Sequence, residues 1–338
     1  PQFGDSPREH HPLSHERRRA ARRRHWPGHD PLVHWPGRPQ RFDRGFEARP
    51  QSGRESRCSM KFTLQDAAGQ PYEAYAYTGG KAFDAVQPTV VFIHGVLGDH
   101  SVWILQTRYL AHHGFNVLAV DLPGHGRSQG EAPRSVEEAA QFIAALLDAA
   151  GVKQAALVGH SWGSLIALEA AARLKDRISH IALVGTAFPM KVSPALLETS
   201  LQEPMKAIEM INVFSRATLA APPSALGPGT WVHGANTALN RRVLASNTQV
   251  NVFHRGFVAC DSYANGLHAM AELTCPVLFV LGQQDQMTAP RAAQSLVKQA
   301  RESGKTHSVV TVPMGHHQMT ESPEETLQAL LRFFTARP

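Results

Sequence analysis

Short, uninterrupted apolar runs alternate with longer stretches of helical periodicity along most of this chain. The apolar runs predict buried strands within residues 89–95, 115–120, 154–160, 180–187, 275–285 and 307–317. The periodic stretches predict helices at about 102–112, 136–151, 164–176, 289–303 and from about 323. Continuous apolar strands that alternate with helices are typical of a parallel sheet covered on both faces. The pattern therefore predicts an α/β protein with a mostly parallel, doubly wound sheet.

Two segments depart from this alternation. Residues 61–66 and 72–80 alternate apolar and polar positions around the turn sequence Ala-Ala-Gly-Gln-Pro, which predicts a β-hairpin before the parallel strands. Residues 188–262 are mostly helical, with a Pro/Gly-rich interruption, where another strand would be expected. We therefore predict one domain over residues 60–338, with a helical cap inserted at about 188–262.

Residues 1–59 show neither a helical nor a strand period. They contain 13 Arg, no Lys and 7 acidic residues, a net charge of +6, which equals the net charge of the whole chain. A segment so rich in Arg, His and Pro buries too little apolar surface to offset its ordering entropy, so we expect it to be disordered. We favour translated upstream sequence, with synthesis starting at Met60, over a basic nucleic-acid-binding arm or a targeting peptide.

Composition excludes several classes of protein. Because residues 60–338 have no net charge, nothing in them predicts nucleic-acid binding. The chain has no apolar run near the roughly 18 residues of a membrane span and no secretory signal pattern. Its cysteines, Cys58, Cys260 and Cys275, have neither disulfide-framework nor zinc-site spacing. We expect a cytoplasmic protein with no metal, no cofactor, no nucleic-acid partner and no membrane contact, which acts on a small molecule.

The sequence Gly159-His160-Ser161-Trp162-Gly163 lies between a predicted buried strand and a strongly periodic helix. This is the setting of a nucleophile elbow, a sharp strand-to-helix turn that exposes a serine hydroxyl. Small residues at 159 and 163 leave room for the turn, and the following helix N-terminus favours developing negative charge. Ser161 is therefore the candidate nucleophile.

A serine hydroxyl needs a base, and the base needs an orienting carboxylate. Asp285 ends one predicted strand and His316 follows the next, so the order Ser161, Asp285, His316 is the one expected of a catalytic triad on this class of sheet. Taken singly, Asp285 could cap a helix and His316 could be a surface histidine. The adjacent His317 is an alternative base that the residues alone leave open.

Five motifs resemble those of the α/β-hydrolase superfamily, in order over residues 94–325: His-Gly-Val-Leu-Gly from 94, Asp-Leu-Pro-Gly-His-Gly-Arg-Ser from 121, Gly-His-Ser-Trp-Gly from 159, Gly-Gln-Gln-Asp from 282 and Gly-His-His-Gln from 315. The resemblance implies the α/β-hydrolase fold with a serine nucleophile, and it favours His316 over His317 as the base. It also implies an oxyanion hole formed by the backbone N–H groups of Val96 and Trp162.

These features predict a serine hydrolase that cleaves a carboxylic ester through an acyl-enzyme, with a fairly apolar substrate. The same triad also supports C–C bond hydrolysis or aminopeptidase-like amide hydrolysis. An alternative of another class is a ligand receptor with this fold and negligible turnover. We expect a minority of nine apolar cap residues to line the substrate pocket and the rest to seat the cap: Met190, Met205, Met210, Ile211, Val213, Phe214, Trp231, Phe253 and Phe257.

Overall fold

The computed structural model describes residues 58–66, 68–84, 86–217 and 232–336, all of which belong to one compact unit, Pro50–Pro338. The predicted disorder of residues 1–59 therefore falls almost wholly outside the described residues. The described chain begins just before the first strand, which starts at Ser59.

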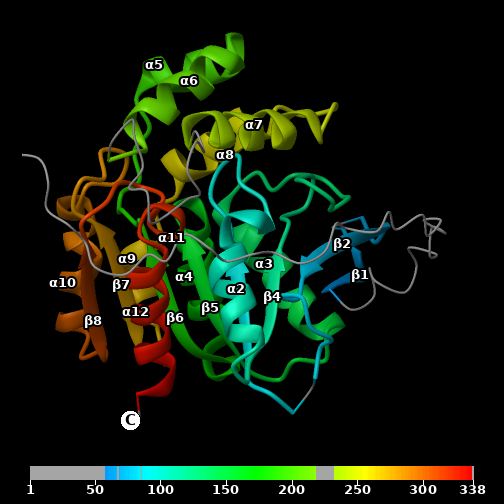
Figure 1. The fold of residues 1–338 in the computed structure, drawn as a ribbon, viewed down its shortest axis with the longest axis vertical. Helices are drawn as coiled ribbons and strands as arrows, with labels where there is room; N and C mark the ends of the chain where they lie inside the picture. Colours follow the sequence, from blue (N-terminus) through cyan, green and yellow to red (C-terminus); the bar gives the residue numbers. More distant parts are fainter. Residues whose placement is uncertain (1–57, 67, 85, 218–231, 337–338) are drawn as a thin grey trace, which may run out of the picture. The chain divides into compact units, whose positions relative to one another are not determined.

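Eight strands form one sheet in the order β1-β2-β4-β3-β5-β6-β7-β8 (Figure 1). The strands are β1 (Ser59–Gln65), β2 (Pro71–Tyr77), β3 (Thr89–Ile93), β4 (Asn116–Val120), β5 (Ala155–His160), β6 (Ile178–Val184), β7 (Val277–Gly282) and β8 (His307–Val312). Strands β3 to β8 are parallel to one another, whereas β2 is antiparallel to both β1 and β4. The predicted hairpin and the mostly parallel sheet are confirmed.

Helices cover both faces of the sheet. Along β3, Val91 and Ile93 pack into one apolar cluster, and Val90 and Phe92 pack into another on the opposite face. The first cluster includes residues of α3 (Val136–Ala149), α4 (Trp162–Leu174), α9 (Gly266–Ala271) and α10 (Gln294–Glu302). The second includes residues of α2 (Ile104–Ala111), α11 (Gln318–Glu321) and α12 (Pro323–Thr335). Burial on both faces explains why these strands are continuous apolar runs.

Several helix ends differ from their predicted positions. The helix expected from residue 102 begins instead as the 3-10 turn η2 (His100–Trp103), because the Asp99 side chain accepts the N–H of Ser101 at 2.9 Å. A further 3-10 turn, η4 (Pro290–Ala293), precedes α10, and η3 (Lys175–Arg177) follows α4. The short helix α9 is not anticipated by the sequence pattern. Its six residues are too few to show a helical period.

Of the described helices between β6 and β7, four precede the short α9, namely α5 (Pro194–Gln202), α6 (Pro204–Phe214), α7 (Val232–Ala245) and α8 (Val252–Ser262). They form the inserted helical segment that the sequence predicts, and we call α5 to α8 the cap. Figure 1 shows the four cap helices gathered at one end of the sheet. Part of the Pro/Gly-rich interruption, residues 218–231, lies outside the described residues.

Candidate active site

Ser161 lies at a strained turn between β5 and α4. Its backbone has φ 52° and ψ −119°, in the positive-φ region that residues with a Cβ rarely adopt. The Ser161 N–H donates to the carbonyl of Val184 at 2.9 Å, which ties the turn to β6. The serine thus ends a central strand at the N-terminus of a 13-residue helix, as the elbow motif predicts.

The glycines of the elbow are required by close backbone contacts. A Cβ on Gly159 would lie 2.0 Å from the carbonyl oxygen of Gly163. A Cβ on Gly163 would lie 2.5 Å from the carbonyl oxygen of Ile93. The first contact is between the two arms of the turn, and the second is between α4 and β3. Both distances are too short for any side chain, so both positions demand glycine.

Asp285 and His316 follow β7 and β8 and meet at the end of the sheet. Nδ1 of His316 lies 2.8 Å from Oδ2 of Asp285, and both side chains are buried. Burial alone would raise the pKa of Asp285. However, the facing imidazole of His316 and the N–H and hydroxyl of Thr288 hold this pKa below its usual value. Asp285 therefore stays ionised, and its contact places the imidazole proton on Nδ1 and leaves Nε2 as an acceptor.

Sequence reasoning missed Thr288 as a member of this group. The Thr288 hydroxyl lies 2.8 Å from Oδ2 of Asp285, 2.9 Å from the Gly185 carbonyl oxygen and 3.1 Å from Nδ1 of His316. Its single proton is shared between the Asp285 and Gly185 oxygens. The Thr288 N–H also donates to Oδ1 of Asp285 at 2.8 Å. The spacing Asp-x-x-Thr is a signal that could have found it, since a carboxylate often accepts the N–H three residues on.

The side chain of His317 has different neighbours from that of His316. It is partly buried, and desolvation together with the nearby Arg216 guanidinium holds its pKa well below the usual value. Its ring packs 5.4 Å from the ring of His160, measured between centroids. The structure thus joins Asp285 to His316 rather than to His317.

The two expected oxyanion donors also lie near Ser161. Trp162 is the first residue of α4, and Val96 follows the end of β3 and lines the same cavity as Ser161 and His316. Neither backbone N–H donates to an acceptor within the described part of the chain. Both donors are therefore available to a substrate oxygen.

Ser161 and His316 open onto one cavity of about 220 Å³ beneath the cap. No direct hydrogen bond joins their side chains among those that the described residues form, and catalytic contacts of this kind are often longer without substrate. Apolar side chains make up most of the cavity wall: Val96, Met190, Val192, Leu196, Met210, Ile211, Phe214, Phe257 and Met287.

The prediction that only a minority of the nine cap residues line the pocket is wrong. Five of them line this cavity: Met190, Met210, Ile211, Phe214 and Phe257. Met205 and Val213 are largely exposed, and Phe253 is buried within the cap. Trp231 lies outside the described residues. The sequence pattern could not separate these groups, because helices α6 and α8 contact both the cavity and other parts of the cap.

Other histidines near the site hold the backbone. Nε2 of His94 accepts the N–H of Leu122 at 3.1 Å, and Nδ1 of His125 lies 2.9 Å from the Pro123 carbonyl. Nε2 of His160 lies 2.8 Å from the carbonyl of His316 beneath the elbow. Each of these contacts joins an imidazole ring to the backbone of a loop near Ser161.

A parallel sheet covered by helices on both faces, a strained serine after a central strand and a carboxylate–histidine pair at the ends of later strands are the arrangement of an α/β hydrolase. The family model described as alpha/beta hydrolase fold matches residues 88–323. This chain therefore belongs to the α/β-hydrolase family. None of the helices within the described ranges is long and apolar enough to cross a membrane.

Named relatives include several kinds of enzyme. The 2-(acetamidomethylene)succinate hydrolase of Mesorhizobium japonicum is 28% identical over 74% of this chain and 88% of its own length. The lipase LipV of Mycobacterium tuberculosis is 37% identical over 29% of this chain and 37% of its own length. The dihydrolipoyllysine-residue acetyltransferase component of an acetoin cleaving system, from Cupriavidus necator, is 39% identical over 33% of this chain, but the match spans only 28% of that protein.

Solved structures show the same fold. An esterase from Exiguobacterium antarcticum has a TM-score of 0.67 at 17% identity, covering 82% of this chain and 100% of the esterase. A thermophilic esterase has a TM-score of 0.64 at 22% identity, covering 82% of this chain and 97% of its own. At these identities the likeness concerns the fold alone.

Proposed function

We propose that this protein is a serine hydrolase that cleaves carboxylic esters with an apolar acyl chain through an acyl-enzyme. The observation that carries the proposal is the convergence of Ser161, at its strained turn, with the buried Asp285–His316 pair around one apolar cavity. The lipase name of one sequence relative agrees with this chemistry.

In the first half-reaction, Nε2 of His316 accepts the proton of the Ser161 hydroxyl as Oγ attacks the ester carbonyl. The carbonyl oxygen becomes an oxyanion, which the N–H groups of Val96 and Trp162 stabilise. His316 then gives its proton to the leaving alkoxide, and the alcohol departs. Asp285 stabilises the imidazolium that exists between these two proton transfers.

In the second half-reaction, water replaces the alcohol. His316 accepts a proton from the water as its oxygen attacks the acyl carbon, and the same two N–H groups again hold the oxyanion. Return of the proton to Oγ of Ser161 releases the carboxylic acid. Each proton that His316 takes is given back, so the cycle needs no other reactant.

The cavity favours an uncharged acyl group over a dicarboxylate. By its name, the Mesorhizobium relative acts on a substituted succinate. In this chain the one Lys or Arg among the described cavity residues is Lys191, whose Nζ already donates to the Asp261 carbonyl at 2.6 Å and lies 3.5 Å from Oδ2 of that residue. Because the Lys191 ammonium already contacts Asp261, the cavity offers mainly apolar contact to a substrate.

The test is steady-state hydrolysis of 4-nitrophenyl esters from acetate to octanoate, beside 4-nitroanilides of the same acyl groups and 2-(acetamidomethylene)succinate. We expect multiple turnovers on the esters, and Ser161→Ala should lower kcat by at least about 10⁴-fold. Ser308→Ala is the matched control, because Ser308 is an exposed serine on β8 that does not line the cavity, and it should keep its activity.

Other results would identify the alternatives. Faster cleavage of the anilides would make the protein an amidase. Turnover of the succinate alone would place it with the Mesorhizobium enzyme. Release of no more than one nitrophenol per protein, with tight retention of the acyl group, would make it a receptor.

We also propose a cytoplasmic location. Its support is that Cys58, Cys260 and Cys275 are free thiols, with no disulfide among the described residues, as a reducing compartment would keep them. Cell fractionation with an antibody against the cap tests this, and recovery of the protein outside the cytoplasm would contradict it.

A further inference from the structure

The segment that carries Val96 is held in an unusual conformation. We call residues 94–101 the oxyanion loop. Within it, the N–H of Gly98 donates to the carbonyl of Gly95 at 3.0 Å, which closes a turn around Val96 and Leu97. Leu97 has φ 54°, a conformation that costs a residue with a Cβ about 1–2 kcal/mol. If Leu97 relaxed to negative φ, the chain would rotate about the N–Cα bond of Leu97 and shift the adjoining Val96, whose N–H belongs to the preceding peptide.

Cap helix α7 holds the strained residue directly. Nδ2 of Asn240, a side chain only 3% exposed, donates to the carbonyl of Leu97 at 3.1 Å. Asn240 in turn accepts a hydrogen bond from Asn236 at 3.5 Å, and Asn236 donates to Asn212 on α6. Buried amides of this kind are costly unless paired, so each one restricts the position of the next. The chain of contacts runs from the cavity wall on α6 to the oxyanion loop.

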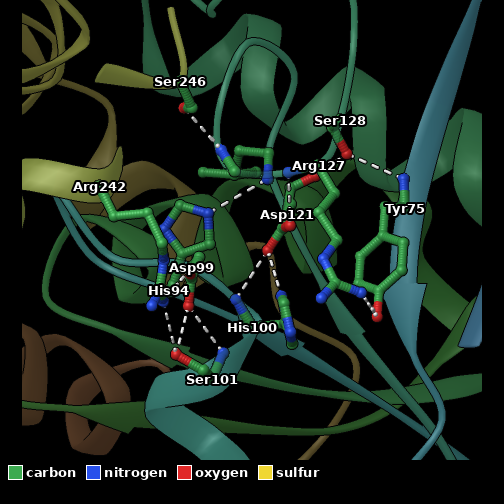
Figure 2. Close-up of polar contacts among 12 residues, drawn as sticks. Tyr75, His94, Asp99, His100, Ser101, Asp121, Arg127, Ser128, Arg242 and Ser246 are labelled. Atoms are coloured by element: carbon green, nitrogen blue, oxygen red, sulfur yellow. Dashed lines mark hydrogen bonds and ion pairs between the residues drawn. The ribbon is translucent and has the colours of Figure 1, made fainter. Parts of the chain in front are cut away.

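The C-terminal half of α7 contacts the far end of the same loop (Figure 2). A terminal nitrogen of Arg242 lies 2.6 Å from Oδ2 of Asp99, whose Oδ1 accepts the N–H and hydroxyl of Ser101. Ser246, at the end of α7, accepts the N–H of Gly126 from the loop that follows β4. Helix α7 and the residue that follows it thus contact both the oxyanion loop and the loop after β4.

Asp99, His100 and Asp121 place possible ligand atoms within 4.8 Å of one another. All four carboxylate oxygens already accept hydrogen bonds: Asp99 from Ser101 and Arg242, and Asp121 from His100 and the Arg127 N–H. Figure 2 shows these bonds converging from three segments of the chain. The hydrogen bonds of this cluster therefore stabilise the conformation of the oxyanion loop.

We infer that α7 positions the oxyanion hole, with Asn240 and Arg242 as positioning residues that keep the Val96 N–H aimed at the substrate oxygen. The inference rests on the proposed function and adds residues to it, since neither side chain lines the cavity. A helix of the cap thereby controls transition-state stabilisation as well as covering the substrate.

Because these contacts act on the Val96 N–H, their loss should affect kcat and KM differently. Substrate binds mainly through its acyl chain, whereas the oxyanion exists only in the tetrahedral state. Loosening the Val96 N–H should therefore lower kcat and kcat/KM together and leave KM nearly unchanged. A role limited to folding would lower the melting temperature without this pattern.

The experiment compares Asn240→Leu, Arg242→Gln and Arg242→Lys with wild-type protein, and Arg241→Gln is the matched control because Arg241 is an exposed cation on the same helix. For each protein we would measure kcat and KM on 4-nitrophenyl butyrate, the inhibition constant of an alkyl trifluoromethyl ketone, the rate of Ser161 labelling by an alkyl fluorophosphonate, and the melting temperature. The ketone forms a tetrahedral oxyanion on the serine and so reports on the oxyanion hole.

We expect Asn240→Leu and Arg242→Gln to lower kcat about tenfold, less than the 10²–10³ of losing a donor outright, with KM within about twofold. Ketone affinity should fall by the same factor as kcat/KM, Arg242→Lys should recover part of the loss, and Arg241→Gln should match wild type. Arg242 is 61% exposed, so its substitution leaves a folded protein even if Asn240→Leu does not.

Wild-type kcat and ketone affinity in folded Arg242→Gln and Asn240→Leu would overturn the inference, and so would a rise in KM at constant kcat. If wild-type protein turns over no ester but is labelled at Ser161, the labelling rates of the variants alone test the role of α7. If it is neither active nor labelled, the proposed function fails first, and the role of α7 fails with it.

Discussion

Oδ2 of Asp285 lies 2.8 Å from Nδ1 of His316, although the two residues are 31 positions apart in the chain. The parallel strands β7 and β8 bring them together, because both residues follow strands that end at the same edge of the sheet. The carboxylate is buried and also accepts three hydrogen bonds from Met287 and Thr288. Its position is therefore fixed from several directions, which is what orientation of an imidazole requires.

Replacing this carboxylate should abolish most activity without unfolding the protein. In Asp285→Asn an amide can no longer hold the His316 proton on Nδ1, so we expect kcat to fall by about 10⁴-fold, as a wrong tautomer does elsewhere. Thr288→Val removes the hydroxyl but keeps the N–H that Oδ1 of Asp285 accepts, and it should lower kcat about tenfold. Steady-state kinetics with circular dichroism as a folding check would measure both. Retention of a tenth of the wild-type kcat in Asp285→Asn would argue against its role.

The elbow should tolerate no side chain at Gly159. We expect Gly159→Ala to cost more than about 4 kcal/mol of unfolding free energy, because its Cβ would meet the Gly163 carbonyl at 2.0 Å. The control is Gly304→Ala, where φ is +66° but nothing lies within 4 Å, so only about 1–2 kcal/mol of backbone strain is expected. Urea denaturation compares the two. Equal losses would show that the elbow can relax around a methyl group.

Acyl-chain selectivity should depend on the inner side of α6. Met210 lines the cavity, whereas Met205 on the same helix is 41% exposed. Met210→Trp should fill the cavity and lower kcat/KM for octanoate by at least about tenfold while acetate changes little, since each displaced methylene is worth about 1–3 kcal/mol. Met205→Trp should leave both unchanged. A parallel fall for acetate and octanoate would place the acyl chain elsewhere.

Acid should destabilise the fold through buried neutral histidines. Burial lowers the pKa of His125 and of His160 to about 3 from an ordinary value of 6.5. Between these values the unfolded chain binds a proton that the folded protein does not. The unfolding free energy is therefore full above pH 6.5 and falls as the pH drops toward 3, by about 1.4 kcal/mol per pH unit for each histidine.

The measurement is urea denaturation from pH 4 to pH 6.5, in which His125→Asn should reduce the slope against pH by about one proton. His112→Asn is a suitable control, because His112 is exposed. A slope that His125→Asn leaves unchanged would mean that the ring is charged in the folded state.

The amino-acid sequence predicts some helix boundaries but leaves details of their hydrogen bonding open. Ser135 and Glu138 have the spacing of a capping box, and Ser135 caps α3 by accepting the N–H of Glu138 at 3.2 Å. The reciprocal bond differs, since the Glu138 carboxylate accepts from Arg134 instead of Ser135. The end of a helix can be predicted from neighbours a few residues apart, but a choice between two adjacent N–H groups depends on the path of the preceding chain.

By itself, the sequence determined the alternation of strands and helices, the hairpin, the helical insertion and the turn at Ser161, because apolar period and glycine spacing act over short distances. Only the tertiary structure decided the strand order, which histidine meets Asp285, which cap residues face the cavity, and that Asn240 reaches Leu97 over 143 positions. Those contacts join distant segments, and their geometry depends on how whole strands and helices pack, which no local pattern encodes.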